Sequence, residues 1–234
     1  IPTKLRRYIF TSFFILESRQ NNPLISIKNL FLIKDKLDWI INERAVKHGD
    51  GIHPKHQLTN YHQFFIDRII NGQTVLDVGC GNGSVAISIA KKLSKSLIIG
   101  IDINKKNIEF AREKQKESNL KNINFINGNI NDYSEIVSDV VILSNVLEHI
   151  EDRVEFLIKL KKRFKPSLFL IRVPDLERDW TIPFKKEMGI YYFSDKTHFI
   201  EHTEEEFREE IKRAGLKTKS LTKNWSEIWA ECES

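Results

Sequence analysis

The chain is poor in cysteine and lacks long apolar runs, and each shortage excludes a class of protein. Cys80 and Cys232 are the only cysteines in 234 residues, too few for the disulfide framework of a small secreted domain. No uninterrupted apolar run reaches the roughly 18 residues that a membrane span needs. Internal repeats and low-complexity tracts are also lacking, which argues against a repeat architecture. These absences favour a globular protein in the reducing cytosol, so we expect a cytoplasmic location.

The rest of the composition is that of an ordinary globular protein with a basic charge balance. Hydrophobic residues make up 41% and charged residues 29% of the chain, and its length suits one α/β domain with additional elements. The formal net charge is +5 and the isoelectric point is about 9.0. This balance permits contact with nucleic acid or an anionic surface without requiring it.

The most informative stretch is a glycine-rich turn that runs from Val75 to Gly83 and reads VLDVGCGNG. A short apolar run that carries one acid ends at the glycines, and a segment with helical periodicity follows it. Glycines without a Cβ adopt unusual backbone angles and let backbone N–H groups approach a ligand. The start of the next helix points its partial positive charge at the same place. Strand, glycine turn and helix are typical of the nucleotide-binding opening of a doubly wound sheet.

From residue 74 onward, the pattern alternates between strand and helix. We predict strands at 74–78, 97–101, 123–126, 139–143, 168–173, 216–222 and 224–231. We predict helices at 83–93 and 104–118, and another with apolar residues at Leu147, Ile150, Val154, Leu157, Leu160 and Phe164. Such alternation predicts an α/β fold with helices on both faces of the sheet. We therefore expect residues 72–234 to form a doubly wound, seven-stranded, mainly parallel sheet.

Residues 1–71 are predicted to form an N-terminal helical extension. Lys4, Arg6 and Arg7 precede an apolar stretch over residues 8–16. After a turn at 21–23, a second helix carries helically spaced residues at Ile27, Leu30, Lys34, Leu37 and Ile41. The two helices could pack on the sheet domain. Alternatively, residues 1–42 could form an amphipathic segment that contacts a membrane surface or a partner.

A loop with several histidines ends this extension. Residues 49–56 are rich in glycine and carry one proline, and His48, His53, His56 and His62 lie in or beside them. A His-x-x-His spacing alone is weak evidence for a metal. The loop could face a substrate, or its histidines could be structural or surface residues.

The connection over residues 174–201 is long and aromatic, which is typical of a lid or a binding loop. Its aromatic residues are Trp180, Phe184, Tyr191, Tyr192, Phe193 and Phe199. Thr203 and Glu206 have the spacing of a capping box and predict a helix start directly after this lid insertion. We expect Trp225 and Trp229 to be packing residues.

The glycine turn and the strand ends resemble the class I S-adenosylmethionine-dependent methyltransferases. A dinucleotide-binding turn would place its third glycine at position 84, which is Ser, whereas Gly83 and the strand acid Asp77 match the methyltransferase pattern. Residues 98–102 resemble the family's second motif, whose acid, here Asp102, holds both ribose hydroxyls. Gly128 and Asn129 stand where the family usually has Gly-Asp near the adenine. The nearby Asp132 could substitute for that missing acid.

The resemblance covers about residues 61–231 and implies S-adenosylmethionine as the cofactor. The residues expected to bind it are Tyr61, Asp77, Gly79, Cys80, Gly81, Gly83, Asp102, Ile103, Asn129, Ile130 and Ser144.

Glu148, His149 and His198 are the candidate catalytic residues. Asn145-x-x-Glu148-His149 with a late His198 resembles the metal-dependent 2′-O-methyltransferases of small-RNA 3′ ends. Those enzymes use Glu-x-x-Glu-His and a later His five residues before the Thr that opens the last helix, a spacing that His198 and Thr203 keep. Asn145 replaces one anionic ligand of that pattern. Ubiquinone-pathway O-methyltransferases also carry a Glu-His pair here, and positions 145, 148 and 149 share one face if a helix has begun.

Three roles stay open for Glu148, His149 and His198. They could bind a divalent metal, His149 or His198 could act as a base without a metal, or the cluster could simply shape the pocket. Histidine suits the base role because its pKa lies near neutrality.

The preferred hypothesis is O-methylation of a small-molecule or glycan acceptor. Residues Ile52–His56 and Tyr61–Phe65 resemble bacterial methyltransferases of surface-polysaccharide biosynthesis, and aromatic faces with polar groups suit sugars. RNA 2′-O-methylation is the alternative, favoured by the basic charge but without an appended RNA-binding module. A non-catalytic cofactor-binding partner subunit is a third hypothesis. The sequence indicates no oligomeric state.

Overall fold

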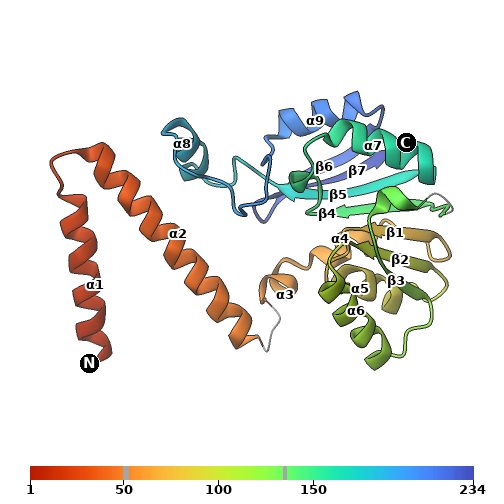
Figure 1. Cartoon of the computed structure of the whole chain (residues 1–234), viewed down its shortest axis with the longest axis horizontal. Helices are drawn as coiled ribbons and strands as arrows, with labels where there is room; N and C mark the ends of the chain where they lie inside the picture. Colours follow the sequence, from red (N-terminus) through yellow and green to blue (C-terminus); the bar gives the residue numbers. More distant parts are fainter. Residues whose placement is uncertain (50–52, 134–135) are drawn as a thin grey trace. The chain divides into compact units, whose positions relative to one another are not determined.

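The computed structural model of the chain describes residues 1–49, 53–133 and 136–234 and consists of two compact units. The first unit is Ile1–Thr59 and the second is Asn60–Ser234. Figure 1 shows the helices of the first unit and the sheet of the second. Asp50 to Ile52 of the predicted histidine loop lie outside the described residues, as does the side chain of His56.

The first unit contains α1 (Thr3–Ser18), α2 (Pro23–His48) and α3 (Lys55–Thr59). The Asn22 side chain accepts from the backbone N–H of Leu24 at 3.0 Å and so caps α2, and Pro23 opens that helix. Glu17 joins the helices near the turn, because its carbonyl accepts from Ser26 at 2.8 Å and its carboxylate from Asn29 at 2.7 Å. Among the described residues, none of the helices combines the length and apolarity that crossing a bilayer requires.

The second unit is built on one seven-stranded sheet with the order β3-β2-β1-β4-β5-β7-β6 (Figure 1). Its strands are β1 (Thr74–Val78), β2 (Leu97–Asp102), β3 (Ile123–Asn127), β4 (Val140–Ser144), β5 (Leu168–Pro174), β6 (Lys217–Asn224) and β7 (Glu227–Glu233). The first five strands are parallel, and β7 pairs antiparallel with both β5 and β6. The predicted fold class is confirmed.

Helices cover both faces of this sheet, as Figure 1 shows. Helices α4 (Tyr61–Ile66), α5 (Ser84–Lys92) and α6 (Lys105–Glu117) pack on one face, and α7 (Arg153–Phe164) and α9 (Glu204–Arg213) pack on the other. Successive residues of β1 point to opposite faces, so Leu76 and Val78 join the α7–α9 core while Val75 joins the α4–α6 core. Because both faces are buried, the central strands are apolar almost throughout.

The two compact units divide before α4, whereas the sequence suggested a domain boundary after residue 71. Phe64 and Phe65 of α4 are buried in the core of the second unit, which explains why α4 belongs with the sheet. The remaining boundaries of the predicted strands and helices lie within a few residues of the observed ones.

Residues 174–201 contain a short helix, α8 (Thr181–Glu187). Two local expectations were wrong. The helix predicted with apolar residues from Leu147 onward begins later, because Leu147–His149 form a 3₁₀ turn, η2, Ile150 is extended, and α7 starts at Arg153. Asn145 has a φ of +56° and so does not share a helix face with positions 148 and 149. Trp225 is 58% exposed rather than packed, because it lies in the tight turn between β6 and β7.

Candidate functional site

The glycine turn is bonded to the end of the neighbouring strand. The backbone N–H groups of Gly79 and Cys80 donate to the carbonyl of Ile101 at 2.8 and 3.1 Å. Gly79 and Gly81 both have left-handed backbone angles, with φ of +67° and +55°. A side chain at these positions would be strained. A Cβ on Gly81 would meet nothing within 4 Å, so the backbone there faces open space.

Asp102 lies at the end of β2 and is held by two backbone donors. Its Oδ2 accepts from the N–H of Gly81 at 2.8 Å, and its Oδ1 accepts from the N–H of Asn104 at 2.7 Å. Each carboxylate oxygen keeps a second lone pair, so the group can still accept two hydroxyl donors. This geometry fits the ribose-binding role that the family resemblance implies for Asp102.

A cavity of about 1040 Å³ opens beside the glycine turn at the carboxyl ends of the strands. Six of the predicted site residues line it: Gly79, Asp102, Ile103, Asn129, Ile130 and His149. The other predicted residues do not: Tyr61, Asp77, Cys80, Gly81, Gly83, Ser144, Glu148 and His198. The cavity lies where open α/β sheets bind their ligands.

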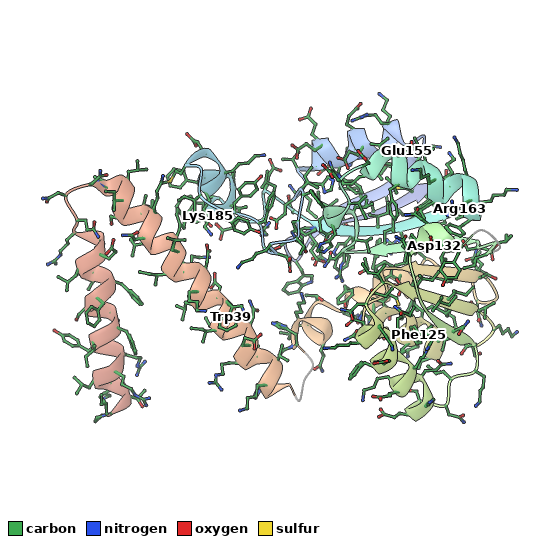
Figure 2. All side chains as sticks on the ribbon, in the orientation of Figure 1. Trp39, Phe125, Asp132, Glu155, Arg163 and Lys185 are labelled. Atoms are coloured by element: carbon green, nitrogen blue, oxygen red, sulfur yellow. The ribbon has the colours of Figure 1, made fainter. Side chains whose placement is uncertain are left out.

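Gly83 packs against the protein rather than facing the cavity. A Cβ on Gly83 would lie 2.6 Å from Cζ of Phe125, which Figure 2 labels on β3, and 2.9 Å from Cβ of Ala111. Gly83 also has a φ of +77°. The third glycine of the turn therefore allows α5 and α6 to approach β3 closely.

A 3₁₀ turn, η1 (Ile130–Asp132), forms the far wall of the cavity. The Asn129 side chain caps this turn by accepting from the N–H of Asn131 at 3.0 Å. Arg163 of α7, labelled with Asp132 in Figure 2, donates to the carbonyls of Asn131 and Tyr133. Asp132 is exposed and does not line the cavity.

Beneath the glycine turn lies a buried charge cluster that contains Asp77. Arg172 of β5 is 4% exposed, and its guanidinium lies 3.1 Å from Glu227 and 3.6 Å from the ring centroid of Tyr61. Burial raises the pKa of Asp77 to about 7, the charge of Asp102 adds to the rise, and Arg172 opposes it. Tyr61 and Asp77 therefore belong to a buried cluster around Arg172 and do not line the cavity.

Glu148, His149 and His198 come together although fifty residues separate the pair from the lid histidine. One carboxylate oxygen of Glu148 and one nitrogen of each imidazole all lie within 4.8 Å of one another. The imidazole centroids are 4.7 Å apart, at an interplanar angle of 75°. The backbone N–H of Phe199 donates to the Glu148 carbonyl at 2.8 Å and fixes the lid to η2.

A hydrogen-bonded chain orients the His149 ring. The Thr197 hydroxyl donates to the Asp195 carboxylate at 2.7 Å and lies 2.8 Å from Nδ1 of His149. The hydroxyl has one proton, which goes to the carboxylate, so Thr197 must accept from Nδ1–H of His149. Nε2 of His149 then keeps its lone pair. Burial and the nearby His198 lower the pKa of His149, which favours the neutral base form.

His198 is oriented in a similar way by a buried carboxylate. Its Nδ1 lies 3.2 Å from Oε1 of Glu201, which only accepts when ionised, so Nδ1 carries the proton. Burial alone would raise the pKa of Glu201, but hydrogen bonds from His198 and Ser194 and the charge of Arg178 outweigh it and lower the pKa to about 2. When the His198 ring is neutral, its Nε2 is likewise left as an acceptor.

Glu148 is the unsatisfied member of the cluster. It is 1% exposed, and neither carboxylate oxygen has a hydrogen-bond partner among the described residues. Burial raises the pKa of Glu148 to about 7. Its own backbone N–H and the charges of His198 and Arg172 lower this pKa but do not outweigh the burial. Two imidazole nitrogens and this carboxylate form a donor set that a divalent cation could bind.

Asn145 does not complete such a metal site. Its amide, oriented to satisfy both groups, accepts from Nη2 of Arg172 at 3.0 Å and donates to the Arg172 carbonyl at 3.3 Å. The position that carries Glu in the metal-dependent pattern is therefore bonded to Arg172.

Several residues of the site were not predicted from the sequence. Arg172 could have been noticed as a single charge within the apolar strand 168–173. Asp195 and Thr197 give no signal, because only the folded lid brings them to His149. Gly128, Asn145 and Phe199 also line the cavity and stand in segments that the sequence had indicated. The remaining cavity residues are ordinary in the sequence: Val78, Ile101, Asn104, Asn131, Val146, Ile150, Asp152, Glu155, Phe156 and Lys159.

Two histidines in or beside the histidine loop have contacts of their own. Nε2 of His53 lies 3.0 Å from the Asn42 side chain, and Nδ1 of His62 lies 2.7 Å from the Ser88 hydroxyl. Residues 48–59 belong to the first unit and the cavity to the second. The role of the histidine loop at the site stays a prediction.

Comparison with curated proteins identifies methyltransferases of several kinds. The chain is 32% identical over 111 residues to the release factor glutamine methyltransferase of Fusobacterium nucleatum, covering 46% of this chain and 31% of that protein. It is 35% identical over 102 residues to the ubiquinone biosynthesis O-methyltransferase of Rickettsia akari, covering 43% of this chain and 39% of that protein. Both matches thus span less than half of the relative's own length.

Solved structures share the fold. The magnesium protoporphyrin IX methyltransferase of Synechocystis with bound S-adenosylhomocysteine superposes with a TM-score of 0.62 at 21% identity, covering 78% of this chain and 84% of that one. A small RNA methyltransferase has a TM-score of 0.62 at 22% identity, covering 74% of this chain and 25% of that one. A family model described as a methyltransferase domain matches residues 69–230. That match exceeds half of the chain, and the chain therefore belongs to the S-adenosylmethionine-dependent methyltransferases of class I.

Proposed function

We propose that the chain transfers the methyl group of S-adenosylmethionine to a hydroxyl oxygen of a small-molecule or carbohydrate acceptor. The observation that carries the proposal is the orientation of His149, whose Nδ1 is bound to Thr197 and whose Nε2 is left as an acceptor beside the cavity. An O-methyltransferase needs such a base, because a hydroxyl must lose its proton as it is methylated.

The cofactor is assigned to the cavity. Asp102 would accept the ribose hydroxyls, the backbone at Gly79 and Gly81 would approach the methionine portion, and Asn129 and Ile130 would flank the adenine. When bound, S-adenosylmethionine supplies a sulfonium methyl group, which an acceptor oxygen takes in line as the carbon–sulfur bond breaks.

His149 is assigned as the general base. Its Nε2 takes the proton from the acceptor hydroxyl, and the resulting positive ring is stabilised through Nδ1–H by Thr197 and Asp195. Glu148 and His198 lie close enough to hold the same hydroxyl group in place. A protonated Glu148 can donate a hydrogen bond, and an ionised one can accept it.

The lid favours a ring-shaped, hydroxylated acceptor. A row of aromatic contacts leads through Tyr192 and Phe193, with centroids 4.4 Å apart, to His198, whose ring centroid is 6.4 Å from Phe193. Aromatic faces next to polar groups suit sugars and other flat ligands. Two solved relatives of the same fold contain apigenin and 1,4-dihydroxy-2-naphthoic acid as small-molecule ligands.

A metal-assisted reaction is the second candidate, favoured by the buried carboxylate of Glu148 and its unsatisfied oxygens. Glu148, His149 and His198 would hold a divalent cation, which would polarise the acceptor oxygen as a Lewis acid. A chelator separates the two candidates, since a reaction that relies on His149 as base is insensitive to it.

The experiment is an acceptor screen with radiolabelled S-adenosylmethionine in the presence of a chelator. The proposal expects label on a hydroxylated small molecule or glycan. Transfer only after a divalent ion is added would favour the metal candidate, and transfer only to RNA would favour 2′-O-methylation. Cofactor binding without transfer to any acceptor would indicate a non-catalytic subunit. Cys80 and Cys232 are both buried and unpaired, which suits the reducing cytosol to which the proposal assigns the protein.

A further inference from the structure

Helix α1 exposes a large apolar surface. In the described part of the chain, α1 buries none of its residues. Its apolar side chains are between 37% and 73% exposed: Leu5, Tyr8, Ile9, Phe10, Phe13, Phe14, Ile15 and Leu16. Figure 2 shows side chains projecting from both sides of this helix. Large exposed apolar surfaces of soluble proteins mark sites of interaction with a partner or a membrane.

The polar side chains within the apolar stretch are satisfied by the helix itself. The Thr11 hydroxyl donates to the Arg7 carbonyl at 2.9 Å, and the Ser12 hydroxyl donates to the Tyr8 carbonyl at 2.9 Å. A hydroxyl that is already hydrogen-bonded costs little to move into an apolar medium. The segment from Tyr8 to Leu16 can therefore leave water without stranding a polar group.

The charged residues of α1 favour a negatively charged partner. Lys4, Arg6 and Arg7 lie in its first two turns, and the first acid of the chain is Glu17. Residues 1–42 contain seven Lys or Arg and three Asp or Glu, a difference of +4. A second copy of the helix packed in parallel would bring the same basic side chains against these. An anionic surface would neutralise them instead.

We propose that α1 inserts into the headgroup region of a membrane that contains anionic lipids. Lys4, Arg6 and Arg7 contact the lipid phosphates and carboxylates, and the apolar side chains between Tyr8 and Leu16 enter the acyl boundary. The apolar stretch is about 14 Å long at 1.5 Å per residue, against about 30 Å of hydrocarbon. The helix therefore lies in one leaflet and does not span the bilayer.

The test is sedimentation of the whole chain with vesicles of phosphatidylcholine and phosphatidylserine, compared with vesicles of phosphatidylcholine alone. Binding is expected to be tighter to the anionic vesicles. Replacing the three basic residues (Lys4→Gln, Arg6→Gln, Arg7→Gln) should weaken it about 100-fold. Replacing two aromatic residues (Phe10→Ser, Phe13→Ser) should weaken it by a similar factor.

A matched control removes three exposed basic residues of the second unit (Lys91→Gln, Lys116→Gln, Lys121→Gln). This variant should keep most of its vesicle binding. Equal losses in the control and the α1 variants would overturn the proposal, because the attraction would then come from net charge. Self-association without vesicle binding, abolished by the Phe10 and Phe13 changes in sedimentation equilibrium, would overturn it in favour of a second copy.

Discussion

Thr197 accepts the Nδ1–H of His149 at 2.8 Å, and this bond determines which nitrogen of the imidazole keeps its lone pair. The two residues come from distant parts of the chain, one from the lid and one from η2. The placement of Thr197 and the orientation of the His149 ring are therefore coupled, since a displacement of residues 195–199 would remove the acceptor from Nδ1.

Thr197→Val should release the His149 ring. Loss of one hydrogen bond of about 1–1.5 kcal/mol predicts a fall in methyl-transfer rate of roughly 5–10-fold. The acid limb of the rate should also move to lower pH, because the imidazolium loses its stabilising acceptor. Nitrogen-15 NMR of the His149 ring should show a fixed Nδ1–H tautomer that becomes mixed in the variant. Thr197→Ser is the matched control and should keep the wild-type rate and the wild-type NMR spectrum of the His149 ring. Unchanged spectra in Thr197→Val would contradict the assignment of Thr197 as the acceptor of the Nδ1–H bond.

Asp102→Ala should weaken binding of S-adenosylhomocysteine. Two charge-assisted hydrogen bonds to the ribose would be lost, at a cost of about 1.5–3 kcal/mol or more, so affinity should fall at least roughly tenfold in calorimetry. Asp132→Ala is the control, since Asp132 is exposed and does not line the cavity. The Asp132→Ala variant should bind S-adenosylhomocysteine with the affinity of the wild type. The opposite order of effects would assign the acidic ligand-binding role to Asp132.

Gly83 and Gly81 should respond differently to Ala. In Gly83→Ala, the new methyl group would overpack against Phe125, and the left-handed backbone would also be strained. The free energy of unfolding should therefore fall by about 2–4 kcal/mol. Gly81→Ala carries only the strain, about 1–2 kcal/mol, but should reduce cofactor affinity. Urea unfolding and calorimetry separate the two effects. Equal stabilities of the two variants would argue against the packing role of Gly83.

The raised pKa of Glu148 should make stability depend on pH. The native carboxyl has a pKa of about 7, against 4.5 for an unperturbed glutamate. Between these values the native state holds the proton more strongly than the unfolded state, so this group lowers stability as pH rises from about 4.5 to about 7. Glu148→Gln removes the titration and should gain stability relative to wild type over this range, by an amount on the order of 2–3 kcal/mol.

Urea unfolding at a series of pH values measures this gain. The exposed Glu151→Gln is the control and should follow the wild-type curve. A constant difference between Glu148→Gln and wild type from pH 4.5 to 7 would show that Glu148 is not buried as a neutral acid.

The sheet and its helices could be predicted because their signals are local. The alternation of apolar strands with helix-period segments, and the capping box at Thr203, depend on residues close in sequence, and both are observed. The same reasoning failed at Leu147 and Ile150, where a continuous apolar period suggested a helix. The chain forms only a 3₁₀ turn there and is extended at Ile150, so that α7 begins at Arg153.

The candidate site was only partly predictable for the same reason. Glu148, His149 and His198 carry recognisable chemistry, so their residue types and spacing indicated them. Asp195 and Thr197 are ordinary loop residues until the lid places them beside His149. Arg172 is a single charge in the apolar strand 168–173, but its contact with Tyr61 and its effect on Asp77 exist only in the folded chain.

The rate of methyl transfer by His149→Ala, measured across pH with a chelator present, tests the central claim most directly. The wild type should show a plateau near neutrality and an acid limb below pH 6.5, because the pKa of His149 is lowered. His149→Ala should lose on the order of 10²–10⁴-fold in rate at the plateau while still binding S-adenosylhomocysteine. A variant that keeps the wild-type rate and its acid limb would contradict the account.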